Sequence, residues 1–166
     1  MPKNGYIFER ELKSILSGEF DKSTGISWLD ETLRRKIVNH PFLVVRAAGS
    51  HGFDLLALRD DISFPIEVKS AKENLFNFST SSGRSQRQAE EYVRLLGNMG
   101  IMPIYAFRLK GVKGDPWRLF TFNLEFKGKY RIIGEIIPKI EITRGGKYTM
   151  KWDEGMPLTK FIEYIF

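Results

Sequence analysis

Two acidic residues and a lysine stand in neighbouring apolar segments of the chain. Asp54 opens the run 54–58, and Glu67 and Lys69 lie in the run 63–69. Charged groups in β-forming apolar segments are costly to desolvate unless they have partners, and a divalent cation is one such partner. Asp54, Glu67 and the carbonyl of Val68 offer hard oxygen ligands suited to Mg²⁺ or Mn²⁺. The spacing therefore predicts a metal-dependent phosphodiesterase site.

Hydrolysis of a phosphodiester needs an activated water and neutralisation of the charge that develops on phosphorus. Glu67 and Lys69 are two residues apart, so in a strand their side chains share one face. There the Lys69 ammonium can orient water or stabilise the phosphorane. Glu9, from the first predicted helix, can add a third carboxylate. Taken singly, Asp54 can simply begin a strand and Glu67 with Lys69 can be an exposed ion pair, but their combination favours a site.

The elements that position these residues follow from hydrophobic periodicity. Helices are predicted over 5–16, from a capping box at Ser27 and Asp30 to Pro41, over 84–99, and over 158–166. Strands are predicted at 42–46, 54–58, 63–69, 103–109, 117–122, 130–142 and 147–152. A helix between two strand blocks implies a crossover, so part of the sheet should be parallel. The expected fold class is α/β, a central mixed β-sheet flanked by helices.

The charge of the chain is unevenly distributed. The net charge is +6 overall, whereas the segment 108–151 holds eleven basic and four acidic residues. Such a segment suits a polyanion such as nucleic acid, although a merely soluble basic surface explains the composition as well. There is no cysteine, which excludes disulfides, zinc–thiolate sites and a thiol nucleophile. Without a signal-like or membrane-spanning apolar run, we expect a cytoplasmic, DNA-associated protein of one domain, residues 1–166.

Several further residues could contact DNA. Lys72 directly follows the strand that carries Lys69, and Arg84 opens the third predicted helix, whose N-terminus favours phosphate. Phe76 and Phe78 lie in the Ser-rich segment 74–85, which is predicted to be a mobile loop. There they either stack on bases or pin the loop to the core. His51 either transfers protons or is a solvated loop residue.

An ordered set of motifs resembles the archaeal Holliday junction resolvase family of the PD-(D/E)xK nuclease superfamily. The set is Gly5 with Glu-Arg-Glu-Leu at 9–12, Val-Val-Arg-Ala-Ala-Gly-Ser at 44–50, Asp-Leu-Leu-Ala at 54–57 and Ile-Glu-Val-Lys at 66–69. Phe53 stands where the superfamily pattern has proline. The resemblance covers most of the chain apart from two apparent insertions, at about 17–41 and 124–146.

The resemblance implies a homodimeric, Mg²⁺-dependent endonuclease that nicks two opposed strands of a four-way DNA junction. It implies that Glu9, Asp54 and Glu67 bind metal and that Lys69 is the catalytic lysine. It further implies that Arg10 and Arg46 contact phosphates and that Ser50 lies near the scissile position. Two alternatives stay open: an endonuclease of the same superfamily that acts on other duplex or branched DNA, and a non-catalytic DNA-binding module.

Overall fold

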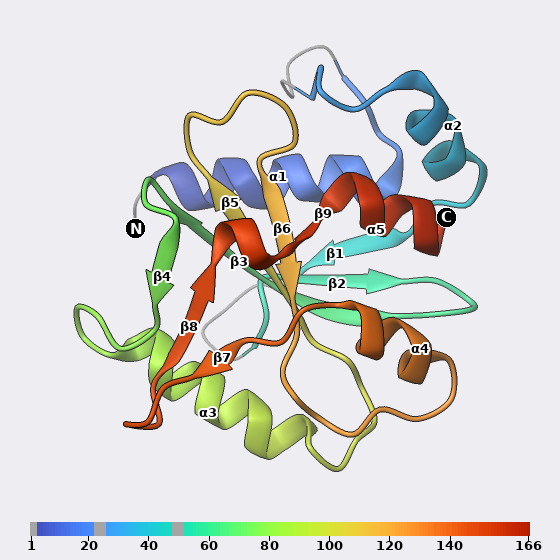
Figure 1. The fold of residues 1–166 in the computed structure, drawn as a ribbon. Helices are drawn as coiled ribbons and strands as arrows, with labels where there is room; N and C mark the ends of the chain where they lie inside the picture. Colours follow the sequence, from blue (N-terminus) through green and yellow to red (C-terminus); the bar gives the residue numbers. More distant parts are fainter. Residues whose placement is uncertain (1–2, 22–25, 48–51) are drawn as a thin grey trace.

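The computed structural model describes residues 3–21, 26–47 and 52–166. These residues form a six-stranded sheet, a second sheet of three strands, and the helices that cover them (Figure 1). The helices are α1 (Lys3–Ser17), α2 (Glu31–Asn39), α3 (Arg84–Leu96), α4 (Lys129–Ile136) and α5 (Leu158–Ile165), with a short 3₁₀ turn, η1 (Trp152–Glu154). The strands are β1 (Leu43–Arg46), β2 (Leu55–Leu58), β3 (Phe64–Ala71), β4 (Leu75–Asn77), β5 (Ile104–Leu109), β6 (Trp117–Phe120), β7 (Glu141–Ile142), β8 (Tyr148–Lys151) and β9 (Met156–Pro157).

The large sheet is mixed, as the sequence predicts. Its order is β1-β2-β3-β5-β6-β9, and every pair is antiparallel except β3 with β5. The parallel pair is joined through β4 and α3, so the predicted crossover is confirmed. The strands β4, β8 and β7 form the small antiparallel sheet.

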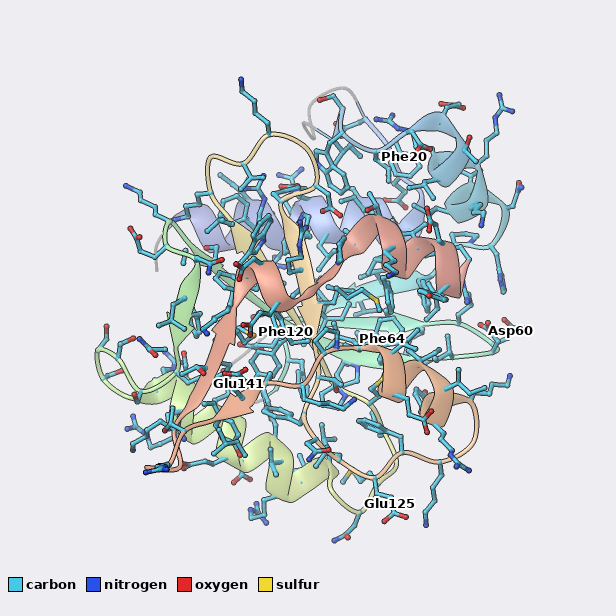
Figure 2. All side chains as sticks on the ribbon, in the orientation of Figure 1. Phe20, Asp60, Phe64, Phe120, Glu125 and Glu141 are labelled. Carbon is cyan, nitrogen blue, oxygen red and sulfur yellow. The ribbon has the colours of Figure 1, made fainter. Side chains whose placement is uncertain are left out.

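Two hydrophobic cores fill the space on either side of the large sheet. One core joins α1, α2 and α5 to the sheet, and the other joins α3 and the small sheet to it. Figure 1 shows α1 and α2 on one side of the molecule and α3 on the other. Phe64 and Phe120 lie inside these cores, whereas Asp60 and Glu125 lie at the periphery (Figure 2).

Strand β3 alternates between the two cores, which decides where its charged residues point. Ile66 belongs to the first core, and Val68 packs against it. Glu67 and Lys69 pair in register with Tyr105 and Phe107, which belong to the second core. Both charged side chains therefore face α3, on the shared face that a two-residue spacing requires.

The predicted strand at 130–142 is wrong in its first part. Residues 129–136 form α4, and only Glu141–Ile142 is a strand. The β-branched isoleucines suggest a strand, but Tyr130, Ile133 and Ile136 recur at helical spacing and pack against the first core. Tertiary packing outweighs β propensity in this segment.

Two smaller predictions also need correction. Helix α2 begins later than expected, because Asp30 itself is the N-cap and accepts the Leu33 N–H at 2.9 Å. The segment 74–85 is not simply a loop, since β4 pairs with β8. Phe78 is fully buried, and Phe76 packs against the second core. Of the two interpretations of these phenylalanines, the structure supports packing.

Within the part of the chain that the structure describes, no helix is both long and apolar enough to span a bilayer.

Candidate active site

The beginning of β2 and the middle of β3 are joined by a side-chain hydrogen bond. Asp54 directly precedes β2, and its Oδ2 accepts the backbone N–H of Val68 at 2.7 Å. The register of β2 with β3 ends at Leu55 and Ile66, so this bond extends the pairing where the ladder stops. Asp54 is thereby fixed beside Glu67, and burial raises the pKa of its carboxyl.

Glu67 is the most deeply buried of the candidate acids, with 4% of the residue exposed. Its Oε1 accepts a hydrogen bond from Lys69 Nζ at 3.1 Å. Its Oε2 is buried and has no hydrogen-bond partner among the described residues. Burial, together with the nearby Asp54 carboxylate, raises the pKa of Glu67 to about 7. A buried acceptor oxygen that receives no hydrogen bond is suited to bind a cation.

Lys69 connects the strand to α3. Its Nζ lies 3.4 Å from Ser85 Oγ and 3.4 Å from Gln88 Oε1, both on α3. These contacts and the bond to Glu67 hold the ammonium in a site where 15% of its side chain is exposed. Sequence reasoning assigned no catalytic role to Ser85 or Gln88. Ser85 and Gln88 are three residues apart and therefore lie on one face of the helix, which was only a weak signal in the sequence.

Glu9 enters from α1, on the other side of the sheet. Its Oε2 accepts from Arg46 Nε at 3.1 Å and lies 3.0 Å from Nη2 of the same residue. Burial and the neighbouring Asp54 raise the pKa of Glu9, while Arg46 opposes that rise. Asp54 contributes to the raised pKa of both Glu9 and Glu67, and we call these three residues the acidic cluster.

The segment that carries Asp54 is supported by an aromatic pair. Phe53 stacks on Tyr92 of α3 with the ring centroids 3.9 Å apart. The Tyr92 hydroxyl donates to the carbonyl of Gly52 at 2.5 Å. Phe53 thus packs the segment that carries Asp54 against α3.

The donor set fits a hard divalent cation. It consists of carboxylates with raised pKa values and a buried Glu67 oxygen that lacks a hydrogen-bond partner in the described residues. Arg46 and Lys69 partly neutralise the cluster from within. The oxygens of Glu9, Asp54 and Glu67 are not all within 4.8 Å of one another in the described structure.

The predicted DNA contacts come from four separate parts of the fold. Arg10, Lys72 and Arg84 are exposed, on α1, directly after β3 and at the start of α3 respectively. Arg46 ends β1 and contacts Glu9. Ser50 and His51 lie outside the described residues, so the structure leaves their predicted roles untested.

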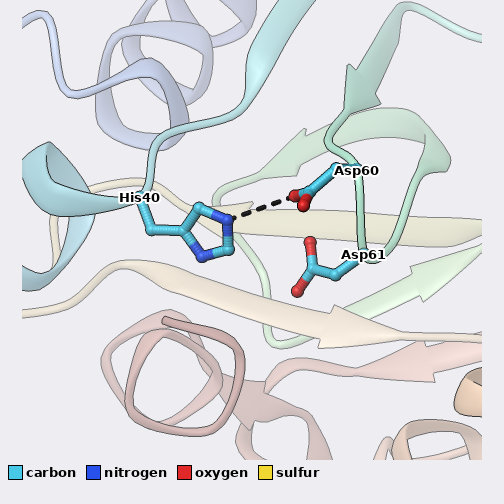
Figure 3. A group of neighbouring side chains, drawn as sticks. All are labelled: His40, Asp60 and Asp61. Atoms are coloured by element: carbon cyan, nitrogen blue, oxygen red, sulfur yellow. Dashed lines mark hydrogen bonds and ion pairs between the residues drawn. The ribbon is translucent and has the colours of Figure 1, made fainter.

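A second group of possible ligands lies at the opposite end of β2. One atom each of His40, Asp60 and Asp61 falls within 4.8 Å of the others (Figure 3). However, Asp61 accepts two hydrogen bonds from Arg59, at 2.5 and 2.8 Å, which lower the pKa of its carboxyl. His40 and Asp60 pair at 3.3 Å on the surface. The guanidinium of Arg59 already supplies a positive charge to this group.

The mixed sheet and its helices have the fold of a Holliday junction resolvase. One similar solved structure is Hjc from Archaeoglobus fulgidus, described as a Holliday junction resolvase from an archaeal hyperthermophile. The match covers 99% of this chain and 99% of that one, with a TM-score of 0.56 and 18% sequence identity. No family model and no curated protein matches the sequence. The resemblance drawn from the motifs is thus confirmed at the level of the fold.

Proposed function

We propose that this protein is a metal-dependent endonuclease that resolves four-way DNA junctions. The observation that carries the proposal is the buried Glu67 Oε2, which has no hydrogen-bond partner in the described residues and lies beside Lys69 and the Asp54-bound backbone of Val68. The resolvase fold of the whole chain supports the same function.

In this proposal, Glu9, Asp54, Glu67 and the Val68 carbonyl hold Mg²⁺, for which Mn²⁺ can substitute. When bound, the cation supplies Lewis-acid activation of water and neutralises charge on the phosphate. Lys69, held by Glu67, Ser85 and Gln88, donates hydrogen bonds to the attacking water or to the phosphorane oxygen.

The remaining proposed residues bind the DNA. Arg10, Arg46, Lys72 and Arg84 contact phosphates: all four are exposed or half-exposed cations, and Arg46 also contacts Glu9. Ser50 lies near the scissile position. The whole chain acts as one nuclease domain, and its family-relative insertions at about 17–41 and 124–146 include α2 and α4. The protein works in the cytoplasm, in association with DNA.

Paired nicking of one junction needs two active sites, so we propose a homodimer. An apolar surface on the hairpin β1–β2 supports this proposal. Leu43 pairs in register with Leu58, and Val45 with Leu56, and all four side chains are exposed. They form one contiguous patch at the edge of the large sheet, which a second copy can cover.

The test is incubation of purified protein with end-labelled four-way junction and with linear duplex of the same sequence, each with Mg²⁺ and with EDTA. We expect symmetric, Mg²⁺-dependent nicks in the junction only. Asp54→Ala and Glu67→Ala should abolish cutting while junction binding stays measurable, because each removes a ligand oxygen of the cluster.

Asp60→Asn is the matched control for these variants. It removes an exposed carboxylate from the group at the other end of β2, so cutting should be unchanged. Retained cutting in both Asp54→Ala and Glu67→Ala would refute the proposed site. Equal cutting of linear duplex would make the protein a different endonuclease, and binding without any nicking would leave a DNA-binding module.

A further inference from the structure

The outer face of α1 carries a polar stripe, of which only Arg10 has a role in the proposed function. Tyr6, Arg10, Lys13 and Ser14 recur at positions i, i+4, i+7 and i+8, so they share one side of the helix. The opposite side belongs to the first core. With Arg46, the four residues line a surface groove of about 580 Å³, which we call the α1 groove.

The α1 groove adjoins the acidic cluster through one side chain. The Arg46 guanidinium contacts Glu9 Oε2 at 3.0 Å, and the same group lies 4.5 Å from the centre of the Tyr6 ring. A ligand in the groove would therefore lie next to the candidate active site. Arg10, Lys13 and Arg46 give this part of the groove three positive charges.

Tyr6 is exposed although it is aromatic. Its exposed fraction is 48%, and it belongs to neither core. The guanidinium groups of Arg10 and Arg46 lie 5.6 and 4.5 Å from its ring centre. An aromatic ring flanked by cations is the arrangement that binds unpaired nucleotides, by stacking on the base and pairing with the phosphate.

The other end of the α1 groove is acidic, since Glu19 and Asp21 contribute to its lining. These carboxylates repel a phosphate backbone, so a strand cannot follow the groove along its whole length. Along α1 the positive part runs from Tyr6 to Lys13, which is about two turns of helix or about 10 Å. That length accommodates only a few nucleotides, since a stacked strand rises about 3.4 Å per nucleotide.

We propose that the α1 groove binds an unpaired nucleotide of the DNA strand next to the scissile phosphate. The base stacks on Tyr6, and Arg10 and Lys13 bind its phosphate. This inference rests on the proposed function in one respect: it takes the neighbouring acidic cluster to be the cleavage site. It adds that the substrate has an unpaired nucleotide near the cleaved bond.

The test is fluorescence anisotropy of the full-length protein in EDTA, which prevents cleavage. The two probes are a labelled duplex and the same duplex with a two-nucleotide bulge. We expect the wild-type protein to bind the bulged probe more tightly. Tyr6→Leu should weaken binding to that probe by about fivefold or more and leave duplex binding unchanged, because loss of one base stack costs roughly that much.

Lys13→Gln should weaken binding to both probes and lower the slope of log affinity against log salt by about one. Two variants on α5 serve as matched controls. Tyr164 is 58% exposed and Lys160 is exposed, and neither lines the α1 groove. Tyr164→Leu and Lys160→Gln should bind both probes as the wild-type protein does, and thermal unfolding should show every variant folded.

The inference is overturned if Tyr6→Leu keeps the preference for the bulged probe, or if Tyr164→Leu loses it equally. This outcome can be told apart from failure of the proposed function. If the wild-type protein cuts junctions but Tyr6→Leu binds the bulged probe normally, the groove inference fails and the proposed function stands. If Tyr6→Leu weakens binding but the wild-type protein never cuts, the proposed function fails and the groove inference stands.

Discussion

Replacing Glu67 with glutamine should make the metal-free protein more stable at neutral and alkaline pH. Glu67 is buried, and one of its oxygens has no hydrogen-bond partner in the described residues. Its pKa is raised from 4.5 to about 7, chiefly by burial. Glutamine keeps an oxygen that can accept from Lys69, and it cannot ionise.

The sign and size follow from proton linkage. As pH rises above 4.5, the unfolded chain releases the Glu67 proton while the folded protein retains it until about pH 7. Stability is therefore lost over this window, by about 1.4 kcal/mol for each unit of pKa difference, or about 3 kcal/mol at most. The glutamine variant does not lose this stability, because its side chain does not ionise. Weakening of the Lys69 bond offsets part of the gain, so we expect a net gain of about 1–3 kcal/mol at pH 8.

The assay is urea unfolding at pH 4, 6 and 8 in EDTA, followed by the fluorescence of the buried Trp117. The advantage of Glu67→Gln should be near zero at pH 4 and should grow with pH. The exposed Glu163, on α5, provides the control, because Glu163→Gln should change stability little at any pH. Adding Mg²⁺ should stabilise the wild-type protein more than the variant, since in the proposed site the cation binds the folded state through Glu67.

The reasoning would be refuted by a Glu67→Gln variant that is less stable than the wild-type protein at pH 8. A stability difference that is the same at pH 4 and pH 8 would also refute it, because the argument depends on ionisation.

Three further predictions test other parts of the structure. Tyr92→Phe removes the hydrogen bond to the Gly52 carbonyl but keeps the ring stack, so cleavage should fall several-fold in single-turnover assays with thermal stability lowered by only about 1 kcal/mol. Gly155→Ala would bring a Cβ to 2.6 Å from the Phe120 ring, so thermal unfolding should occur about 4–8 °C lower. Leu56→Glu puts a charge into the apolar patch on β1–β2, so light scattering should detect a shift from dimer to monomer. An unchanged mass would exclude this patch as the dimer interface.

Strand periodicity was enough to predict how Glu67 and Lys69 are arranged. The two-residue repeat of a strand is local, so it requires both side chains to share a face wherever the strand lies. The bond from Val68 to Asp54 could not be predicted in this way, because it depends on the register of β2 against β3. The contacts of Ser85 and Gln88 with Lys69 depend on how α3 crosses the sheet.

The segment that became α4 shows the limit of local reasoning about the fold. Its isoleucines satisfy a strand pattern and a helix pattern almost equally, and packing of Ile133 and Ile136 against the first core decides between them. The burial of Phe78 was undecided for the same reason, since it depends on β4 pairing with β8.

The parallel pairing of β3 with β5 has a consequence for how the protein folds. Ile66 meets Ile104 only after the chain between them, which includes α3, has crossed back over the sheet. Pairings of such large sequence separation pay their loop-closure entropy before they gain contacts, so they form late and slowly. The same closure brings Ser85 and Gln88 of α3 to Lys69. A nascent chain that has not yet completed β5 therefore lacks the contacts that hold Lys69. The candidate active site is completed together with the central sheet.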